Sequence, residues 1–200
     1  MAARKIILIR HSETTQHGVY LGHEDPPLSD KGRTLLNSFS IDITKWKKPQ
    51  IFVSPLVRAV QTAEILFPER PTTVDARLKE INFGKFGGKS FTEIKSEFPE
   101  KVDRWANEFM SFEFPGGESV VEFKNRVESF LEDTLHNTNG SFVLVAHGGV
   151  IRFLLCKLLD IPYEKHLTFF LKRPSINMID LSEEYGTLSG LNIENFSIRD

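Results

Sequence analysis

Short apolar runs alternate with amphipathic stretches along the chain. Residues 5–9 contain a β-branched apolar run at residues 6–9, a pattern typical of a strand that is buried on both faces of a sheet. Residues 51–53 and 143–146 predict two further short strands. Each run leads into a loop and then into a helical pattern. This repeated order indicates a parallel sheet core, with ligand-binding loops at the carboxyl ends of its strands.

Capping residues and helix breakers place the helices that follow these strands. Ser29 is a candidate N-cap for a helix with apolar residues at helical spacing. Ser54, followed by a proline, predicts the N-cap of a second helix that ends near Pro68. Gly148 and the glycine after it open a third helix, which carries an apolar face.

Two further helical stretches and a hairpin complete the predicted elements. Residues 91–108 and 119–136 have helical patterns on either side of a turn at residues 115–117, and both are candidates for a cap. The tail from Ser175 contains two short apolar runs around a turn at Tyr185. That pattern predicts a hairpin at the edge of the sheet.

These elements together predict an α/β fold. A chain of 200 residues and 22.9 kDa can bury one sizeable core. We therefore expect a three-layer sandwich, in which helices cover both faces of a mostly parallel central sheet. Residues 1–200 are expected to form a single domain, with residues 85–118 as a small helical cap insertion.

Composition and charge exclude several classes of protein. Hydrophobic residues make up 40% and charged residues 26% of the chain, which is typical of neither a disordered nor a membrane protein. The formal net charge is -2 and no run of basic residues occurs, so we expect no nucleic-acid or membrane partner. The apolar run at residues 6–9 is too short for a signal sequence, and we expect a cytoplasmic protein.

Residue types that bind metals are not grouped in the sequence. Cys156 is the only cysteine, which rules out an internal disulfide and a multi-cysteine metal site, and its apolar neighbours indicate a core position. Residues 84–90 look like a nucleotide-binding Walker A loop, but Phe83 stands where that motif needs its first glycine. We therefore predict neither a metal nor a cofactor.

Basic residues and histidines follow the predicted strands. Arg10 and His11 come directly after the first strand and His147 after the third, at ends that a parallel sheet brings together. Gly148 lets backbone N–H groups approach an anion at a helix N-terminus. Arg58 lies in the first turn of the second predicted helix. A locally cationic pocket of this kind suits a phosphate group.

Taken singly, each of these residues also has a structural interpretation. Arg58 fits a surface arginine whose stem covers an apolar neighbour. Glu80 stands between apolar residues, yet in isolation a surface salt bridge is its default interpretation. A lone histidine at the end of a strand is more often structural than catalytic. Only the occurrence of these residues together favours a catalytic site over separate structural roles.

Several segments together resemble the histidine phosphatase superfamily, which includes the phosphoglycerate mutases. The resemblance runs in the right order through most of the chain and rests on Arg10-His11-Ser12-Glu13-Thr14, residues 28–32, residues 54–63, Glu80 and Ala146-His147-Gly148. Within the superfamily, the length and residues 84–88 and 105–119 are most similar to the short alpha-ribazole phosphatases of cobalamin assembly.

The resemblance implies a phosphomonoesterase that works through a phosphohistidine. It implies that His11 attacks phosphorus while Arg10, Arg58 and His147 hold the phosphoryl oxygens. Glu80 would protonate the leaving group and then activate water. The implied partner is a small-molecule phosphomonoester, and alpha-ribazole 5′-phosphate is the expected substrate.

Two positions depart from the commonest pattern of the family. Ser12 stands where glycine is usual, and its side chain could crowd the phosphate loop. His17 stands where an asparagine usually contacts the phosphate. The imidazole of His17 could still donate one hydrogen bond, or it could face solvent.

Alternative functions and placements stay open at this level. A phosphoglycerate mutase-like phosphotransferase or a broad-specificity sugar phosphatase would share the chemistry. A non-catalytic phospholigand-binding module would need the cations but neither a nucleophile nor an acid. Phe109, Phe112 and Phe114 could stack on an aromatic base or belong to the core. A homo-oligomer is compatible with the sequence.

Overall fold

A six-stranded mixed sheet forms the centre of the protein. The computed structural model describes residues 4–43, 49–138, 140–183 and 185–197. The strand order is β4-β3-β5-β1-β6-β7. The first four strands are parallel to one another, whereas β6 runs antiparallel to β1 and β7 runs antiparallel to β6. These strands are β1 (Arg4–Arg10), β3 (Gln50–Val53), β4 (Thr73–Val74), β5 (Phe142–Ala146), β6 (Ser175–Leu181) and β7 (Gly186–Ile193). A separate two-stranded sheet pairs β2 (Ser40–Asp42) with β8 (Asn195–Ser197).

Strand β1 divides the core into two halves, as its continuous apolar run predicts. Ile6 and Leu8 belong to one hydrophobic cluster, whereas Ile7 and Ile9 belong to the other. Successive side chains of a strand point to opposite faces, so four consecutive apolar residues require cover on both sides.

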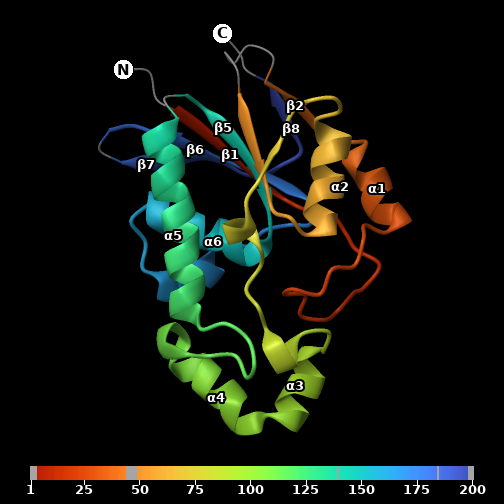
Figure 1. Cartoon of the computed structure of the whole chain (residues 1–200), viewed down its shortest axis with the longest axis vertical. Coiled ribbons are helices and arrows are strands. Elements are labelled where there is room, and N and C mark those ends of the chain that lie inside the picture. Colours follow the sequence, from red (N-terminus) through yellow and green to blue (C-terminus); the bar gives the residue numbers. More distant parts are fainter. Residues whose placement is uncertain (1–3, 44–48, 139, 184, 198–200) are drawn as a thin grey trace.

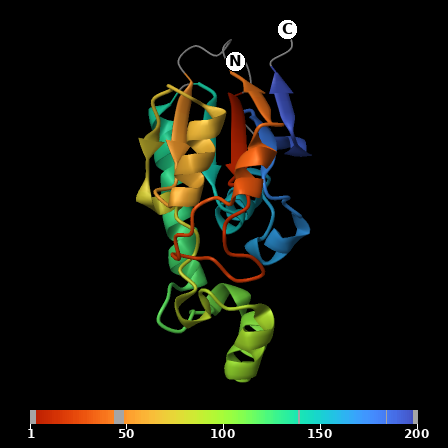
Figure 2. The ribbon, with the colours of Figure 1, turned by 90° about the vertical axis from the view of Figure 1, so that its right-hand side faces the viewer.

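Helices cover both faces of this sheet (Figures 1 and 2). Helix α2 (Val57–Leu66), with α1 (Asp30–Leu36) beside it, lies on one face. Helices α5 (Val120–Asn137) and α6 (Gly148–Leu158) lie on the other. The predicted three-layer α/β architecture is confirmed. In the described part of the chain, no helix combines the length and the apolar composition that a membrane crossing requires.

A small helical cap lies beyond the carboxyl ends of the parallel strands, at the bottom of Figures 1 and 2. It contains α3 (Phe91–Glu97) and α4 (Pro99–Asn107), flanked by the 3-10 turns η2 (Gly84–Phe86) and η3 (Phe109–Ser111). The single helix predicted over residues 91–108 is therefore wrong. Pro99 opens the second helix and disfavours helical geometry at Phe98, where φ is -135° and ψ is 51°.

The second predicted candidate for a cap helix belongs to the body instead. Helix α5 places Val120, Phe123 and Val127 in the main hydrophobic cluster and packs against α6. Aromatic rings fill the interior of the cap, where Phe86, Trp105, Phe112 and Phe114 contact one another. The division into one domain with residues 85–118 as an insertion stays a prediction.

The two predicted N-caps have different outcomes. Ser29 caps α1, since its side chain accepts a hydrogen bond from the backbone N–H of Gly32. Ser54 does not cap α2, which begins at Val57 after Leu56 and has no side-chain cap. The hydroxyl of Ser54 pairs with a ring nitrogen of His147 instead.

The predicted hairpin in the tail is confirmed, with β7 at the edge of the sheet. Its first strand, β6, runs antiparallel to β1, so Ser175 at the start of β6 lies opposite Arg10 at the end of β1. A helical turn that the sequence patterns did not predict, η4 (Tyr163–Thr168), precedes this strand. The chain entering β6 therefore passes the carboxyl end of β1.

Candidate active site

Strand pairing brings the two candidate histidines together. Arg10 ends β1 and pairs with Ala146 at the end of the parallel strand β5. The backbone N–H of His11 donates to the carbonyl of Ala146 at 3.0 Å. His147 follows immediately, and its ring centroid lies 5.2 Å from that of His11.

His11 is held as a neutral imidazole with one free nitrogen. Only 3% of the residue is exposed, and its Nδ1 lies 2.7 Å from the carbonyl oxygen of Ser12. Because a carbonyl can only accept, Nδ1 carries the hydrogen and Nε2 keeps its lone pair. Burial, followed by the positive charges of Arg58, Arg173 and Arg10, holds the pKa of His11 well below its usual value.

His147 presents an unpaired nitrogen in the same place. The residue is buried, and its Nε2 lies 2.7 Å from the hydroxyl of Ser54, whereas Nδ1 is buried without a partner. Burial, then the charge of Arg58, holds the pKa of His147 well below its usual value. The hydroxyl of Ser54 can donate to Nε2, and in that arrangement Nδ1 carries a hydrogen for a ligand.

Arg58 and Arg10 are anchored through their terminal nitrogens. Arg58 is 0% exposed, and its two Nη atoms donate to the carbonyls of Glu24 at 2.6 Å and Gly22 at 2.9 Å. Arg10 donates from Nη1 to the carbonyl of Leu171 at 2.5 Å. In both side chains Nε is buried without a partner. Burial, then the nearby arginine charges, lowers the pKa of Arg10 to about 9, which still leaves it cationic at neutral pH.

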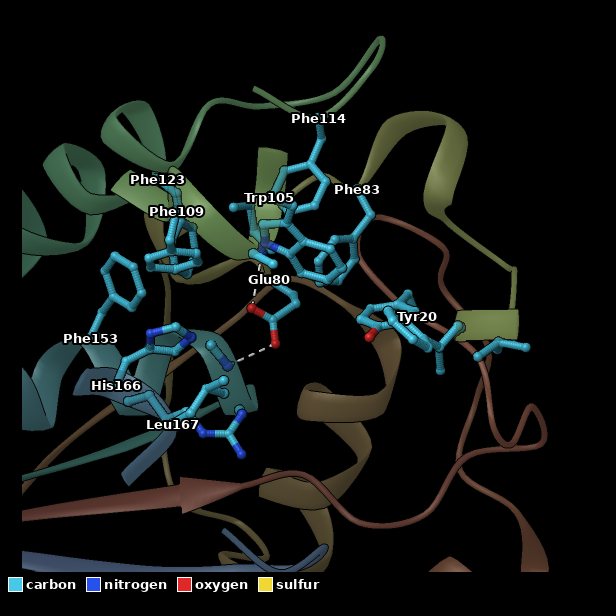
Figure 3. A pocket seen from close by; sticks show the side chains of 18 of the residues that line it. Tyr20, Glu80, Phe83, Trp105, Phe109, Phe114, Phe123, Phe153, His166 and Leu167 are labelled. Carbon is cyan, nitrogen blue, oxygen red and sulfur yellow. Dashed lines mark hydrogen bonds between the residues drawn. The ribbon is translucent and has the colours of Figure 1, made fainter. Parts of the chain in front are cut away.

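Glu80 points into a cavity beside these residues (Figure 3). The residue is 8% exposed. Its Oε2 accepts a hydrogen bond from the backbone N–H of Gly149 at 2.9 Å, and its Oε1 accepts one from that of Ile81 at 3.0 Å. Two backbone donors therefore fix the orientation of the carboxyl group.

The cavity has a volume of about 730 Å³ and two chemically different parts. Its polar part is lined by Arg10, Glu80, Gly148, Gly149, Arg152 and Arg173. Its aromatic part is lined by Tyr20, Phe83, Trp105, Phe109, Phe114, Phe123, Phe153 and His166, most of which surround Glu80 in Figure 3. His11 and His147 adjoin it through their neighbours Arg10 and Gly148. A phosphate bound at the histidines would thus have its organic group among aromatic rings.

Comparison with known proteins agrees with this geometry. Residues 6–194 match the sequence profile of the "Histidine phosphatase superfamily (branch 1)". The chain belongs to this superfamily.

Two characterised relatives and a solved structure match almost all of the chain. Phosphoserine phosphatase 1 of Hydrogenobacter thermophilus is 31% identical and covers 94% of this chain and 92% of its own length. Adenosylcobalamin/alpha-ribazole phosphatase of Escherichia coli is 29% identical, with 94% and 95% covered. The structure of a putative alpha-ribazole-5′-P phosphatase from Escherichia coli is 26% identical and superposes with a TM-score of 0.89 over 98% of this chain and 100% of that one.

Two arginines that line the cavity of this histidine phosphatase were not predicted from the sequence. Arg152 lies on α6, four residues after Gly148, and Arg173 lies two residues before β6; both line the cavity. The helical spacing from Gly148 could have indicated Arg152. Only the register between β6 and β1 brings Arg173 to the site.

The two positions that depart from the family pattern have different surroundings. Ser12 is buried, and its hydroxyl donates to the carbonyl of Gly32 at 2.7 Å, which directs the side chain to that carbonyl. His17 is exposed in the loop after β1 and is not part of the cavity lining. Its contact with phosphate stays a prediction.

The three phenylalanines left open above are divided between the core and the cavity. Phe112 is 1% exposed and packs inside the cap. Phe109 and Phe114 line the cavity, where Phe109 stacks on His166 with ring centroids 4.3 Å apart. Among the described residues, no three His, Cys, Asp or Glu side chains are grouped as metal ligands.

We expect Gly149→Ala to lower turnover by up to about 10²-fold, because small displacements of catalytic groups can cost that much. A Cβ at this position would overlap Oε1 of Glu80 and push the carboxyl group away. Steady-state kinetics with a folded variant would measure the loss. Gly140→Ala is the matched control, since no atom lies within 4 Å of a Cβ there. Equal activity of the two variants would contradict the prediction.

Proposed function

We propose that the protein hydrolyses phosphomonoesters through a phosphohistidine on His11, with alpha-ribazole 5′-phosphate as its substrate. Phosphatase activity is supported by the family and by the matched relatives. The observation that carries the mechanism is the state of His11. Its Nδ1 donates to the Ser12 carbonyl, and burial together with nearby cations keeps the ring neutral, so the Nε2 lone pair is available to attack phosphorus.

In the first step, Nε2 of His11 forms a bond to phosphorus while the ester P–O bond breaks. A proton on Glu80 passes to the leaving oxygen. Arg10, Arg58 and Nδ1 of His147 donate to the non-bridging oxygens, over which charge spreads in the transition state. Their buried Nε and Nδ1 atoms, which have no partner in the described part of the chain, are the donors we assign to this task.

In the second step, water hydrolyses the phosphohistidine. The oxygen of water forms a bond to phosphorus while the N–P bond breaks, and the proton of water passes to the Glu80 carboxylate. Inorganic phosphate leaves, and His11 and protonated Glu80 are restored. Both oxygens of Glu80 already accept one backbone N–H, and each keeps a second lone pair that can take the proton.

The aromatic part of the cavity supports a substrate whose leaving group carries a ring. Trp105, Phe109 and Phe114 come from the cap and Tyr20 from the loop after β1, so they can pack around an aromatic base. The benzimidazole of alpha-ribazole 5′-phosphate provides such a base. The matched Escherichia coli relatives carry the same substrate in their names.

Phosphoserine is a second candidate substrate. The cavity lining also contains Arg152 and Glu164, one cation and one anion. Such a pair fits the carboxylate and the ammonium of an amino acid. The Hydrogenobacter thermophilus relative is a phosphoserine phosphatase, which agrees with this alternative.

The proposal includes a small-molecule partner and a cytoplasmic location. A cavity of about 730 Å³ is of the size that small ligands occupy. Cys156 is a buried free thiol, and burial raises its pKa to about 11, so it is a core residue without catalytic use here. A chain without a disulfide suits a reducing compartment.

One experiment tests the intermediate and the substrate together. Purified protein in excess chelator is given alpha-ribazole 5′-phosphate, phosphoserine, 3-phosphoglycerate and p-nitrophenyl phosphate, each with labelled phosphorus. We expect turnover without metal and the highest kcat/KM for alpha-ribazole 5′-phosphate. Rapid quenching should trap acid-labile, base-stable label on His11, with none on His11→Asn.

The alternatives predict other results. A higher kcat/KM for phosphoserine would favour the second candidate, and isomerisation of 3-phosphoglycerate would indicate a phosphotransferase. Label on a serine or aspartate would overturn the phosphohistidine mechanism. Activity restored only by added metal would overturn metal independence.

A further inference from the structure

Arg173 approaches the phosphate site from the side of β1 opposite to His147. Strand β1 lies between β5 and β6, so Arg10 pairs with Ala146 on one side and with Ser175 on the other. His147 follows Ala146 directly, whereas Arg173 precedes Ser175 by two residues. The antiparallel direction of β6 thus places an arginine beside the nucleophile strand.

The segment that carries Arg173 is packed directly on Arg10. Leu171 is 2% exposed, and its carbonyl accepts the hydrogen bond from Nη1 of Arg10 at 2.5 Å. Pro174 and Ser175 are buried as well. The backbone on both sides of Arg173 is therefore packed against the site.

Arg173 is half-buried, and its guanidinium has no hydrogen-bond or ion-pair partner among the residues that the structure describes. Its Nε is buried without a hydrogen-bond partner, as are the Nε atoms of Arg10 and Arg58. The ion pairs between described residues do not include Arg173. An arginine that is partly withdrawn from water and has an unpaired buried Nε is a candidate to bind an anionic ligand.

The surrounding charges agree with this location. After burial, Arg173 is the first charge that lowers the pKa of Arg10 and the second, after Arg58, that lowers the pKa of His11. Burial lowers the pKa of Arg173 from its usual value, and the negative charges of Glu80 and Glu13 offset only part of this shift. Arg173 is therefore close to the nucleophile, to the general acid and to Arg10.

We propose that Arg173 is a third arginine of the phosphoryl site and donates hydrogen bonds to a non-bridging oxygen on the side opposite to His147. This inference rests on the proposed function, since it concerns the phosphoryl group carried by His11. The three equatorial oxygens gain charge in the transition state, so a donor aimed at them accelerates transfer rather than only binding substrate. The expected ligand chemistry is a tetrahedral dianion that becomes trigonal during transfer.

The test compares Arg173→Gln and Arg173→Lys with Lys172→Ala, a variant of the exposed neighbouring cation. Arg173→Gln should lower kcat by about 10²-fold, the effect of removing one transition-state donor. It should weaken inhibition by orthovanadate, a mimic of the trigonal transition state, more than inhibition by inorganic phosphate. Arg173→Lys should recover only part of the loss, because an ammonium lacks the guanidinium fork. Lys172→Ala should match the wild type.

The pH profile provides a readout that a purely structural role would not change. The charged groups that face His11 are Arg10, Arg58 and Arg173, and the neutral His147 lies beside it. Loss of the Arg173 charge makes protonated His11 less unfavourable, so the pKa of His11 rises. As the pH is lowered, His11 of the variant therefore becomes protonated at a higher pH than His11 of the wild type, and the acid limb of kcat/KM, which reports the free enzyme, moves toward neutrality in Arg173→Gln. Arg173→Lys keeps the positive charge, so the acid limb of its pH profile should lie at the same pH as in the wild type.

Unchanged kcat and vanadate inhibition in a folded Arg173→Gln variant would overturn the assignment. Equal weakening of vanadate and phosphate inhibition, with an unmoved acid limb, would overturn it too, since Arg173 would then only bind the ground state. If Arg173→Gln does not fold, the same two inhibitors tested on Arg173→Lys decide. If the wild type traps no phosphohistidine, the proposed function is refuted. If the wild type traps phosphohistidine and Arg173→Gln behaves like the wild type, only this inference is refuted.

Discussion

Replacing Glu80 by glutamine should lower hydrolysis of alpha-ribazole 5′-phosphate by roughly 10²- to 10⁴-fold, the range that general acid catalysis supplies. A ribose hydroxyl is a poor leaving group without a proton, whereas p-nitrophenolate leaves readily. Cleavage of p-nitrophenyl phosphate should therefore suffer far less. Phosphohistidine should also accumulate where the activation of water is lost.

The measurement is phosphoenzyme formation in a single turnover with each substrate. Glutamine has one acceptor oxygen, whereas Glu80 accepts backbone N–H groups from both Ile81 and Gly149, so the variant loses one of these bonds. Thermal unfolding should confirm that it remains folded. A structural disturbance affects both substrates alike, and equal losses would reject the role of Glu80 as an acid.

Arg58→Lys should lower turnover by about 10²- to 10³-fold, the effect of removing a positioned donor to the transition state. The Nη atoms of Arg58 donate to the carbonyls of Gly22 and Glu24, whereas its Nε has no partner among the described residues and is the donor assigned to the phosphoryl group. A lysine ammonium is a single point of charge. It cannot serve the carbonyls and the phosphate together, so we expect a larger effect on kcat than on the affinity for inorganic phosphate.

Arg33→Lys, an exposed substitution on α1, is the matched control and should be neutral. Kinetics and phosphate inhibition constants measured on both variants test the prediction. Equal losses in kcat and in phosphate affinity for Arg58→Lys would mean that Arg58 only provides uniform binding. Activity close to that of the wild type would mean that Arg58 does not bind the phosphoryl group.

Local patterns were sufficient to predict the strands that carry the candidate catalytic residues. The apolar run of β1 required cover on both faces, and the structure provides it. Arg10 and His11 lie at the carboxyl end of β1 and His147 follows β5, so the parallel pairing of these strands brings the three residues together. The ring centroids of His11 and His147 lie 5.2 Å apart. Such conclusions follow from the sequence because the period of a strand and the common edge of a parallel sheet depend on local chemistry.

Contacts between distant segments were decided only by the tertiary structure. The sequence of Ser54 and Pro55 has the form of a helix N-cap, yet the hydroxyl of Ser54 pairs with His147, 93 residues away. The local sequence of Glu80 does not tell a salt bridge from a cavity position, and only the tertiary structure brings the backbone N–H of Gly149 to its carboxyl group in the cavity. Arg173 lines the cavity because β6 runs antiparallel to β1. A strand's direction and register depend on packing across the whole sheet, which no short window of residues contains.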